Sequence, residues 1–178
     1  MVCLFPACSD SPDPDPVADA GWLEARWTGA DSGKLAARAT AEWCGRSGLL
    51  EIRAVQGDTG VAMVLYPWDT IEAGTYRVVP PDRADTAVPS AGLALRVFAT
   101  NAVQGYQGDS GAVVLERSGS GELSGTLDAR ARSVVNGKQV TLTGKMRGLT
   151  VVSQTRGCAP APAADTADTS DGSGTEVD

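Results

Sequence analysis

The chain of 178 residues contains no histidine. Histidine is the usual base that activates a serine or cysteine nucleophile, and it is also a common zinc ligand. Aromatic residues are few, with four Trp, three Tyr and two Phe, and much of the apolar content is Ala and Val. We therefore expect a core of small and β-branched side chains, no catalytic set, and no metal or cofactor site.

The sequence also lacks any cluster of lysine and arginine interleaved with aromatic residues, which argues against a nucleic-acid surface. The net charge is −7, but nine of the 22 acidic residues lie before Gly21 or after Cys158. The span between these two residues carries 13 acids against 15 bases. We therefore predict a polar, Pro- and Asp-rich segment over 1–20, a single domain over 21–158, and a disordered acidic tail over 159–178.

No stretch has the 3.6-residue apolar period of a helix, and no glycine-rich phosphate loop is present. Apolar and polar residues instead alternate, as in GKLAARATAEWC, and turn-forming sequences such as VNGK separate the alternating runs. The pattern predicts about nine strands, over 22–29, 34–44, 48–56, 61–67, 75–79, 92–100, 110–117, 122–134 and 138–153.

Many short alternating strands are typical of an all-β domain with one buried and one solvated face. We expect an antiparallel β-sandwich, with a closed β-barrel as the alternative, because alternation is the same in both.

The chain begins MVCLFPACSDSPDPDP. The tetrad FPAC, which ends at Cys8, resembles the lipobox of bacterial lipoproteins, in which the cysteine is lipidated and becomes the mature N-terminus. The polar, Pro-rich residues after Cys8 suit a tether between a lipid anchor and a folded domain. The resemblance implies an exported protein that is held to a membrane of the bacterial cell envelope or is extracellular.

Cys3 lies before the lipidated position, within the segment that processing would remove. Cys44 and Cys158 then remain, near the two ends of the folded region. Two cysteines in an exported protein most often pair, so we expect a Cys44–Cys158 disulfide. Two independent buried thiols are the alternative.

The stretch Gly-Asp-Ser-Gly around Ser110 resembles the nucleophile motif of trypsin-like serine proteases. That family continues with a second glycine, where this chain has Ala112, and its mechanism needs a histidine base. We judge the resemblance spurious and predict that Gly105 to Gly111 forms a turn leading into a strand.

Tyr66, Trp68 and Tyr76 surround a predicted turn. An exposed Trp with Tyr neighbours can stack on a sugar or hold an apolar ligand, so these three are the candidate surface for a ligand or partner. Core packing is the alternative for each of them.

Three functions compete. The first is a non-enzymatic, lipid-anchored interaction or structural module of the cell envelope, with a protein or glycan partner. The second is a carrier with an apolar interior that holds a small molecule or lipid. The third is a glycan-active enzyme that uses two carboxylates within about 10 Å of each other. The Ala-rich inward faces favour a filled core, and therefore the first.

Overall fold

The computed structural model describes residues 21–99 and 102–154, and these form ten strands. The strands are β1 (Gly21–Gly29), β2 (Gly33–Cys44), β3 (Leu49–Gln56), β4 (Thr59–Tyr66), β5 (Gly74–Val78), β6 (Ser90–Ala99), β7 (Ala102–Arg117), β8 (Leu123–Ser133), β9 (Gln139–Leu149) and β10 (Val151–Gln154). A 3₁₀ turn at Pro81–Arg83 is the only helical element of the described residues. The all-β prediction is therefore confirmed.

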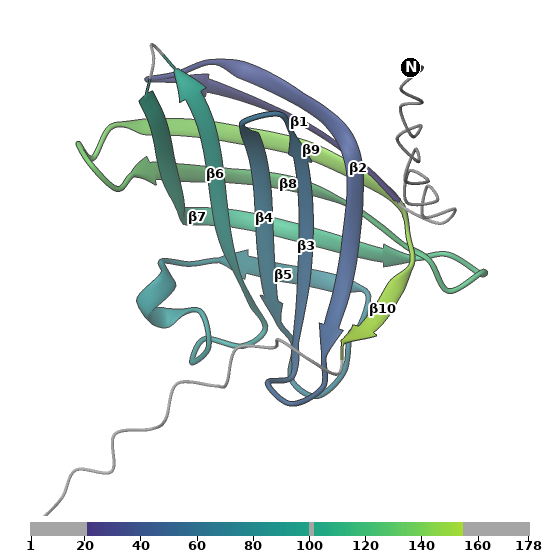
Figure 1. Cartoon of the computed structure of the whole chain (residues 1–178). Helices are drawn as coiled ribbons and strands as arrows, with labels where there is room; N and C mark the ends of the chain where they lie inside the picture. Colours follow the sequence, from purple (N-terminus) through teal and green to yellow (C-terminus); the bar gives the residue numbers. More distant parts are fainter. Residues whose placement is uncertain (1–20, 100–101, 155–178) are drawn as a thin grey trace, which may run out of the picture.

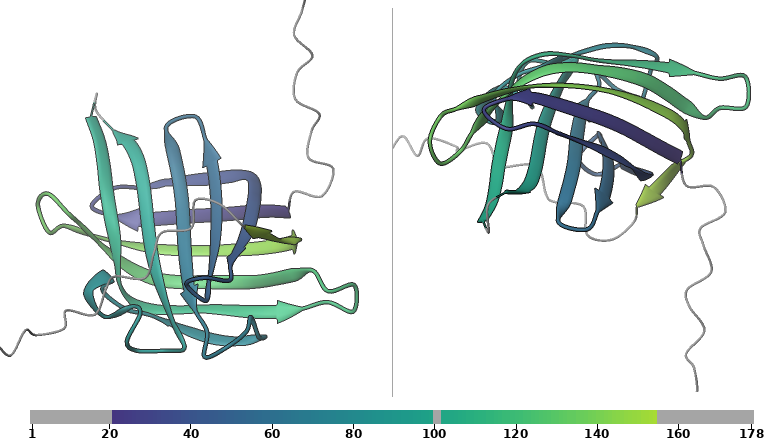
Figure 2. Two further views of the ribbon diagram at one scale, coloured as in Figure 1. Left: turned by 60° about the horizontal axis from the view of Figure 1, so that its bottom comes forward. Right: turned by 90° about the horizontal axis from the view of Figure 1, so that it is seen from above.

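The sheet closes on itself, because β1 pairs with β9 on one side and with β2 on the other. Nine strands form a closed barrel in the order β1-β9-β8-β7-β5-β6-β4-β3-β2, and β10 lies beside β2. In Figure 2 the β1, β9, β8 and β7 group crosses the β3, β4 and β6 group steeply. The architecture is the barrel that the sequence left as the alternative, in place of the preferred sandwich.

Most pairings are antiparallel between strands adjacent in the chain, so the barrel is an up-and-down meander. Two short pairings are parallel. β5 lies between β6 and β7 and runs parallel to β6, and β10 runs parallel to the end of β2. The predicted strand over 138–153 is thus divided, because β9 pairs with β1 and β8 whereas β10 pairs with β2.

The long strand β7 replaces the turn predicted between Gly105 and Gly111. The chain remains extended through this stretch, with a register shift between Gly108 and Ser110 where β7 pairs with β8. Gly108 faces the interior, where an added Cβ would lie 2.7 Å from Val78 Cγ1 and 2.8 Å from Leu93 Cβ. The lack of a side chain at Gly108 therefore lets Val78 and Leu93 pack closely against β7. The register shift is a β-bulge, which accommodates one extra residue in β7.

Inward side chains from every barrel strand meet in one core. Its largest fully buried members are Leu23, Leu35, Leu50, Ile52, Val61, Met63, Leu65, Leu95, Leu115, Leu123, Leu142 and Leu149. Removing each of these from water stabilises the fold by roughly 1.5–3 kcal/mol. Between them lie alanines of β2 and β8, and the Trp27 ring packs directly over Gly33. Small and large residues thus interdigitate and fill the interior.

The two ends of the barrel differ in what they carry (Figure 1). The β1–β2, β3–β4, β6–β7 and β8–β9 connections lie at one end, which we name the hairpin end. The other end, named the terminal end, holds Gly21, where the described chain begins, and Gln154, where it stops beside Cys44. The long β4–β6 connection, which includes β5, is also at the terminal end.

Candidate functional site

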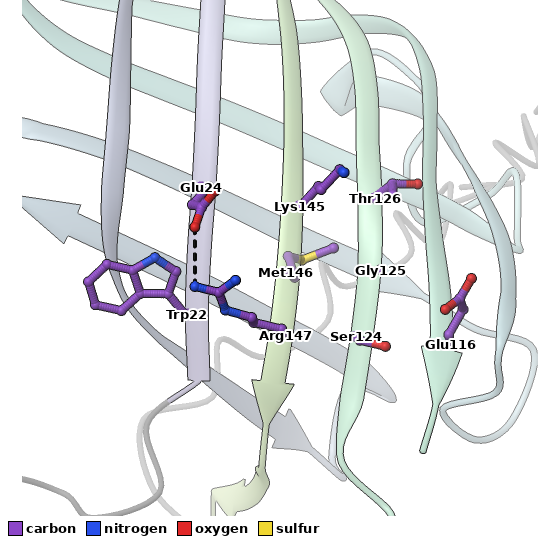
Figure 3. A pocket seen from close by; sticks show the side chains of 9 residues that line it. All are labelled: Trp22, Glu24, Glu116, Ser124, Gly125, Thr126, Lys145, Met146 and Arg147. Carbon is purple, nitrogen blue, oxygen red and sulfur yellow. Dashed lines mark hydrogen bonds and ion pairs between the residues drawn. The ribbon is translucent and has the colours of Figure 1, made fainter.

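Two adjoining hollows of the described residues open on the outer face of β1, β2, β8 and β9. One, of about 600 Å³, is lined by Glu24, Arg26, Lys34, Ala36, Thr126, Asp128, Thr143 and Lys145, among others. A second, of about 280 Å³, adds Trp22, Glu116, Ser124 and Arg147 (Figure 3). The two share Glu24, Thr126 and Lys145, so they form one groove, which we name the outer groove.

The alternation of each strand builds the outer groove. Glu24 of β1 has Ala36 of β2 and Lys145 of β9 as its cross-strand partners, and Lys145 is in turn opposite Thr126 of β8. Short side chains such as Ala36 and Thr126 form the floor, and long charged side chains form the walls. Alternation identified these positions as outward-facing, but only the barrel closure places β1 beside β9.

One ion pair crosses the outer groove. Arg147 Nη2 donates a hydrogen bond to Glu24 Oε1 at 3.2 Å, as drawn in Figure 3. Both side chains are largely exposed, so the pair contributes well under 1 kcal/mol. Trp22 is half-buried, and its cross-strand partners are Arg38 and Arg147, which places an arginine on each side of the indole.

The carboxylates of the outer groove are widely spaced along the sheet. Glu24 on β1 and Glu116 on β7 are separated by β9 and β8, which places their backbones roughly 14 Å apart at the spacing of neighbouring strands. Asp128 is opposite Ala112, four residues along β7 from Glu116, or roughly 13 Å away. These are backbone separations; the two carboxyl groups of an inverting glycosidase lie roughly 6.5–9.5 Å apart.

Ser110 lies exposed on the outer face of β7. It lines a shallow hollow of about 430 Å³ with Asp128, Arg130 and Thr141, among others. Its neighbour Asp109 accepts a hydrogen bond from Arg132 at 3.4 Å. The three lysines Lys34, Lys138 and Lys145 are exposed, and none of them lines this hollow.

The three aromatic residues of the predicted ligand surface are not equivalent. Trp68 is 73% exposed, whereas Tyr66 is half-buried and Tyr76 is buried. Trp68 and Tyr76 line one hollow of about 130 Å³ with Pro67 and Pro89, but Tyr66 does not contribute to it. The structure therefore brings together two of the three, and only Trp68 has a freely accessible ring.

Tyr76 instead supports the β4–β5 connection from inside. Its hydroxyl donates to the Glu72 carbonyl oxygen at 2.9 Å and accepts from the Glu72 N–H at 3.3 Å. Burial raises the pKa of Tyr76 above its ordinary value, and it does the same for Tyr66 and Tyr106. The sequence suggested a surface position for Tyr76 because a residue beside a turn can point its ring toward solvent or toward the core, and local sequence does not distinguish the two.

Cys44 is buried at the end of β2, and its cross-strand partner is Gln154 of β10. Cys158 and Cys8 lie outside the described residues, so the predicted disulfide and the predicted lipidation remain predictions. Within residues 21–99 and 102–154, no group of three or more His, Cys, Asp or Glu side chains is arranged to hold a metal ion. No helix in this part of the chain is long and apolar enough to cross a membrane.

Comparison with known proteins found no matching family model, no matching curated protein and no matching solved structure.

Proposed function

We propose that this protein is a non-enzymatic interaction module of the bacterial cell envelope, exported and held to a membrane through a lipid on Cys8. The observation that carries the proposal is the filled interior of the barrel. Inward side chains such as Leu50, Ile52 and Met63 are 0% exposed, and glycines such as Gly108 are needed for close packing. Binding is therefore left to the outer surface.

The other two functions have less support. A carrier needs an apolar cavity that is enclosed by the protein. The hollows described above lie on the outer face and are lined by charged and hydroxyl side chains. A glycan-active enzyme needs a close carboxylate pair, and the carboxylates of the outer groove are spread over three strands.

The position of the termini suits a tethered module. The described chain begins at Gly21 at the terminal end, and twelve residues separate Gly21 from Cys8. A flexible segment of this length has an end-to-end distance of roughly 20 Å. Such a tether would let the barrel stand clear of the membrane, with the terminal end attached to it.

Cell fractionation with Cys8→Ser tests the anchor. In the bacterium that makes the protein, we expect the wild-type chain in the membrane fraction. Intact-mass spectrometry should give the mass of a chain that starts at Cys8 and carries acyl chains. Cys8→Ser is expected to leave that fraction, because it removes the only thiol at the lipobox position. Cys3→Ser is the matched control and is expected to behave as wild type, since Cys3 lies in the segment that is removed.

If Cys8→Ser stays in the membrane fraction, or if the wild-type mass carries no lipid, the anchoring part of the proposal is wrong.

A further inference from the structure

Exposed large apolar side chains are concentrated at the hairpin end. Among the described residues the exposed ones are Val55, Trp68, Phe98, Val103, Val134, Val135 and Val152, at 51–78% exposure. Five of these seven lie in or beside the β3–β4, β6–β7 and β8–β9 connections. Single exposed apolar residues are ordinary, but a group of them marks an interaction surface.

The strand register joins these residues into one surface. Phe98 and Val103 are directly opposite on β6 and β7, and both face outward. The Val134 N–H donates to the Gly105 carbonyl at 3.1 Å, which holds Val134 beside β7. A Cβ added at Gly105 would lie 3.6 Å from Val134 Cγ2. The Val134 side chain therefore covers Gly105, next to Val103 on the same face.

Arg96 lies at the centre of this surface. Its cross-strand partners are Gly60 on one side and Gly105 on the other, so no side chain flanks it directly. Val55 covers Gly60 in the way that Val134 covers Gly105, with Val55 Cγ2 3.4 Å from the position of a Cβ. We name Val55, Arg96, Phe98, Val103, Val134 and Val135 the hairpin-end patch.

The β8–β9 turn that carries Val134 and Val135 is ordered by hydrogen bonds. Ser133 Oγ accepts from the N–H groups of Val135 and Asn136 at 3.3 and 3.4 Å. The Asn136 carboxamide oxygen accepts from the Lys138 N–H at 3.0 Å. A partner therefore meets valines that are already held outward, which lowers the entropy cost of binding.

Arg96 has no ion pair with any acidic residue of the described chain. Two acids lie in turns at the same end: Asp31 accepts a hydrogen bond from the Tyr106 hydroxyl at 3.3 Å, and Asp58 is in the β3–β4 turn. The exposed, unpaired guanidinium of Arg96 lies on the same face as exposed Phe98, and arginine and aromatic residues are enriched at protein interfaces.

We propose that the hairpin-end patch binds a short segment of a partner protein that presents a carboxylate between apolar side chains. The carboxylate would pair with Arg96, and the apolar side chains would cover Phe98 and the valines. The orientation of the patch rests on the proposed function, because a lipid at Cys8 would leave the terminal end nearer the membrane and the hairpin end facing away. A patch of six residues suits a segment better than a stable dimer, whose interface has roughly 20–30 residues a side.

Peptide selection tests this proposal. The full chain with Cys8→Ser, which carries no lipid, is immobilised and used to select from a library of random short peptides. We expect the enriched peptides to carry Asp or Glu flanked by apolar residues. We expect Arg96→Ala and Phe98→Ala each to weaken the selected peptide by roughly thirtyfold, as for interface residues that dominate binding.

Charge reversal supplies the decisive control. Arg96→Glu is expected to abolish binding of the acidic peptides. Arg130 is also exposed, on the outer face of β8, and Arg130→Glu is expected to leave binding unchanged. Thermal unfolding checks that each variant is folded. Since no lipid is needed, failure of the Cys8 experiment leaves this test intact, and failure here leaves the anchor unaffected.

Three results would overturn the proposal. One is a selection whose peptides bind wild type and Arg96→Glu equally. Another is that the protein binds vesicles of phosphatidylcholine and phosphatidylglycerol, that Arg96→Glu abolishes this binding, and that no acidic peptide is enriched. That result would assign the patch to lipid. The third is a dimer in sedimentation that Arg96→Glu converts to a monomer, which would assign the patch to a second copy of the chain.

Discussion

Replacing Cys158 by serine is expected to lower the free energy of unfolding of the oxidised protein by about 4–5 kcal/mol, because the substitution would remove the predicted disulfide to Cys44. The chain-entropy model gives about 4.7 kcal/mol for a loop of roughly 100 residues, and the loop from Cys44 to Cys158 is slightly longer. Denaturant unfolding under non-reducing conditions measures the loss.

The pairing of β10 with β2 is the structural reason for this expectation. Gln154 is the cross-strand partner of Cys44, and Cys158 follows only four residues later. Four residues span at most about 14 Å, so the chain after Gln154 is long enough to bring Cys158 to Cys44. A disulfide between these two cysteines would therefore hold β10 beside the end of β2.

Cys44 is buried, so its own replacement also disturbs packing, and Cys158→Ser is the more informative variant. If the two cysteines pair, reductant lowers the stability of the wild type to that of Cys158→Ser and leaves the variant unchanged. A Cys158→Ser protein as stable as the oxidised wild type would contradict the disulfide.

Gly111→Ala is expected to destabilise the barrel by about 3 kcal/mol, as for a strained backbone combined with a steric clash. Gly111 has a φ of +120°, and an added Cβ would lie 2.5 Å from the Ala129 Cα and closer still to the Asp128 carbonyl oxygen. Both opposing atoms belong to the backbone of β8, which cannot move away without breaking its pairing with β7.

Two matched variants test whether the loss of stability comes from the backbone conformation and steric contacts of Gly111. Gly119→Ala, in the β7–β8 turn, places its Cβ in open space and is expected to leave stability unchanged. Ser110→Ala is expected to do the same, because the Ser110 side chain is exposed. If Gly111→Ala unfolds with the midpoint of the wild type, the backbone conformation at Gly111 is wrongly described.

These variants also separate the two interpretations of the Gly-Asp-Ser-Gly stretch. A protease would lose activity with Ser110→Ala and keep its fold. The present structure predicts the reverse sensitivity, in which the glycine matters for folding and the serine does not. The stretch is extended backbone with a bulge, and its glycines permit close strand packing.

The faces of the strands could be predicted from the sequence. Alternation places Leu35, Ala37, Ala39, Ala41 and Trp43 on one face; the first four are buried, and Trp43 is half-buried against the core. Alternation has this power because successive side chains of a strand point to opposite sides of the sheet. It depends only on local sequence and is unaffected by which strands pair.

The closure of the sheet could not be predicted in the same way. Whether β1 pairs with β9 depends on contacts between residues more than 100 positions apart, such as Glu24 and Lys145, and alternation does not encode them. The outer groove exists only because of such pairings, whereas the hairpin-end patch depends on the pairing of β6 with β4 and with β7. Arg96 becomes the centre of a surface only when Gly60 and Gly105 are placed on either side of it.

The measurement that most directly tests the account is a titration of the folded barrel with a fluorescent fatty acid, together with native mass spectrometry of the protein as purified. A barrel filled by its own side chains and acting through its outer surface is predicted to show no saturable binding of the probe and no retained apolar molecule. One tightly bound fatty acid or lipid per chain would contradict the filled interior and would make a carrier the better description of this protein.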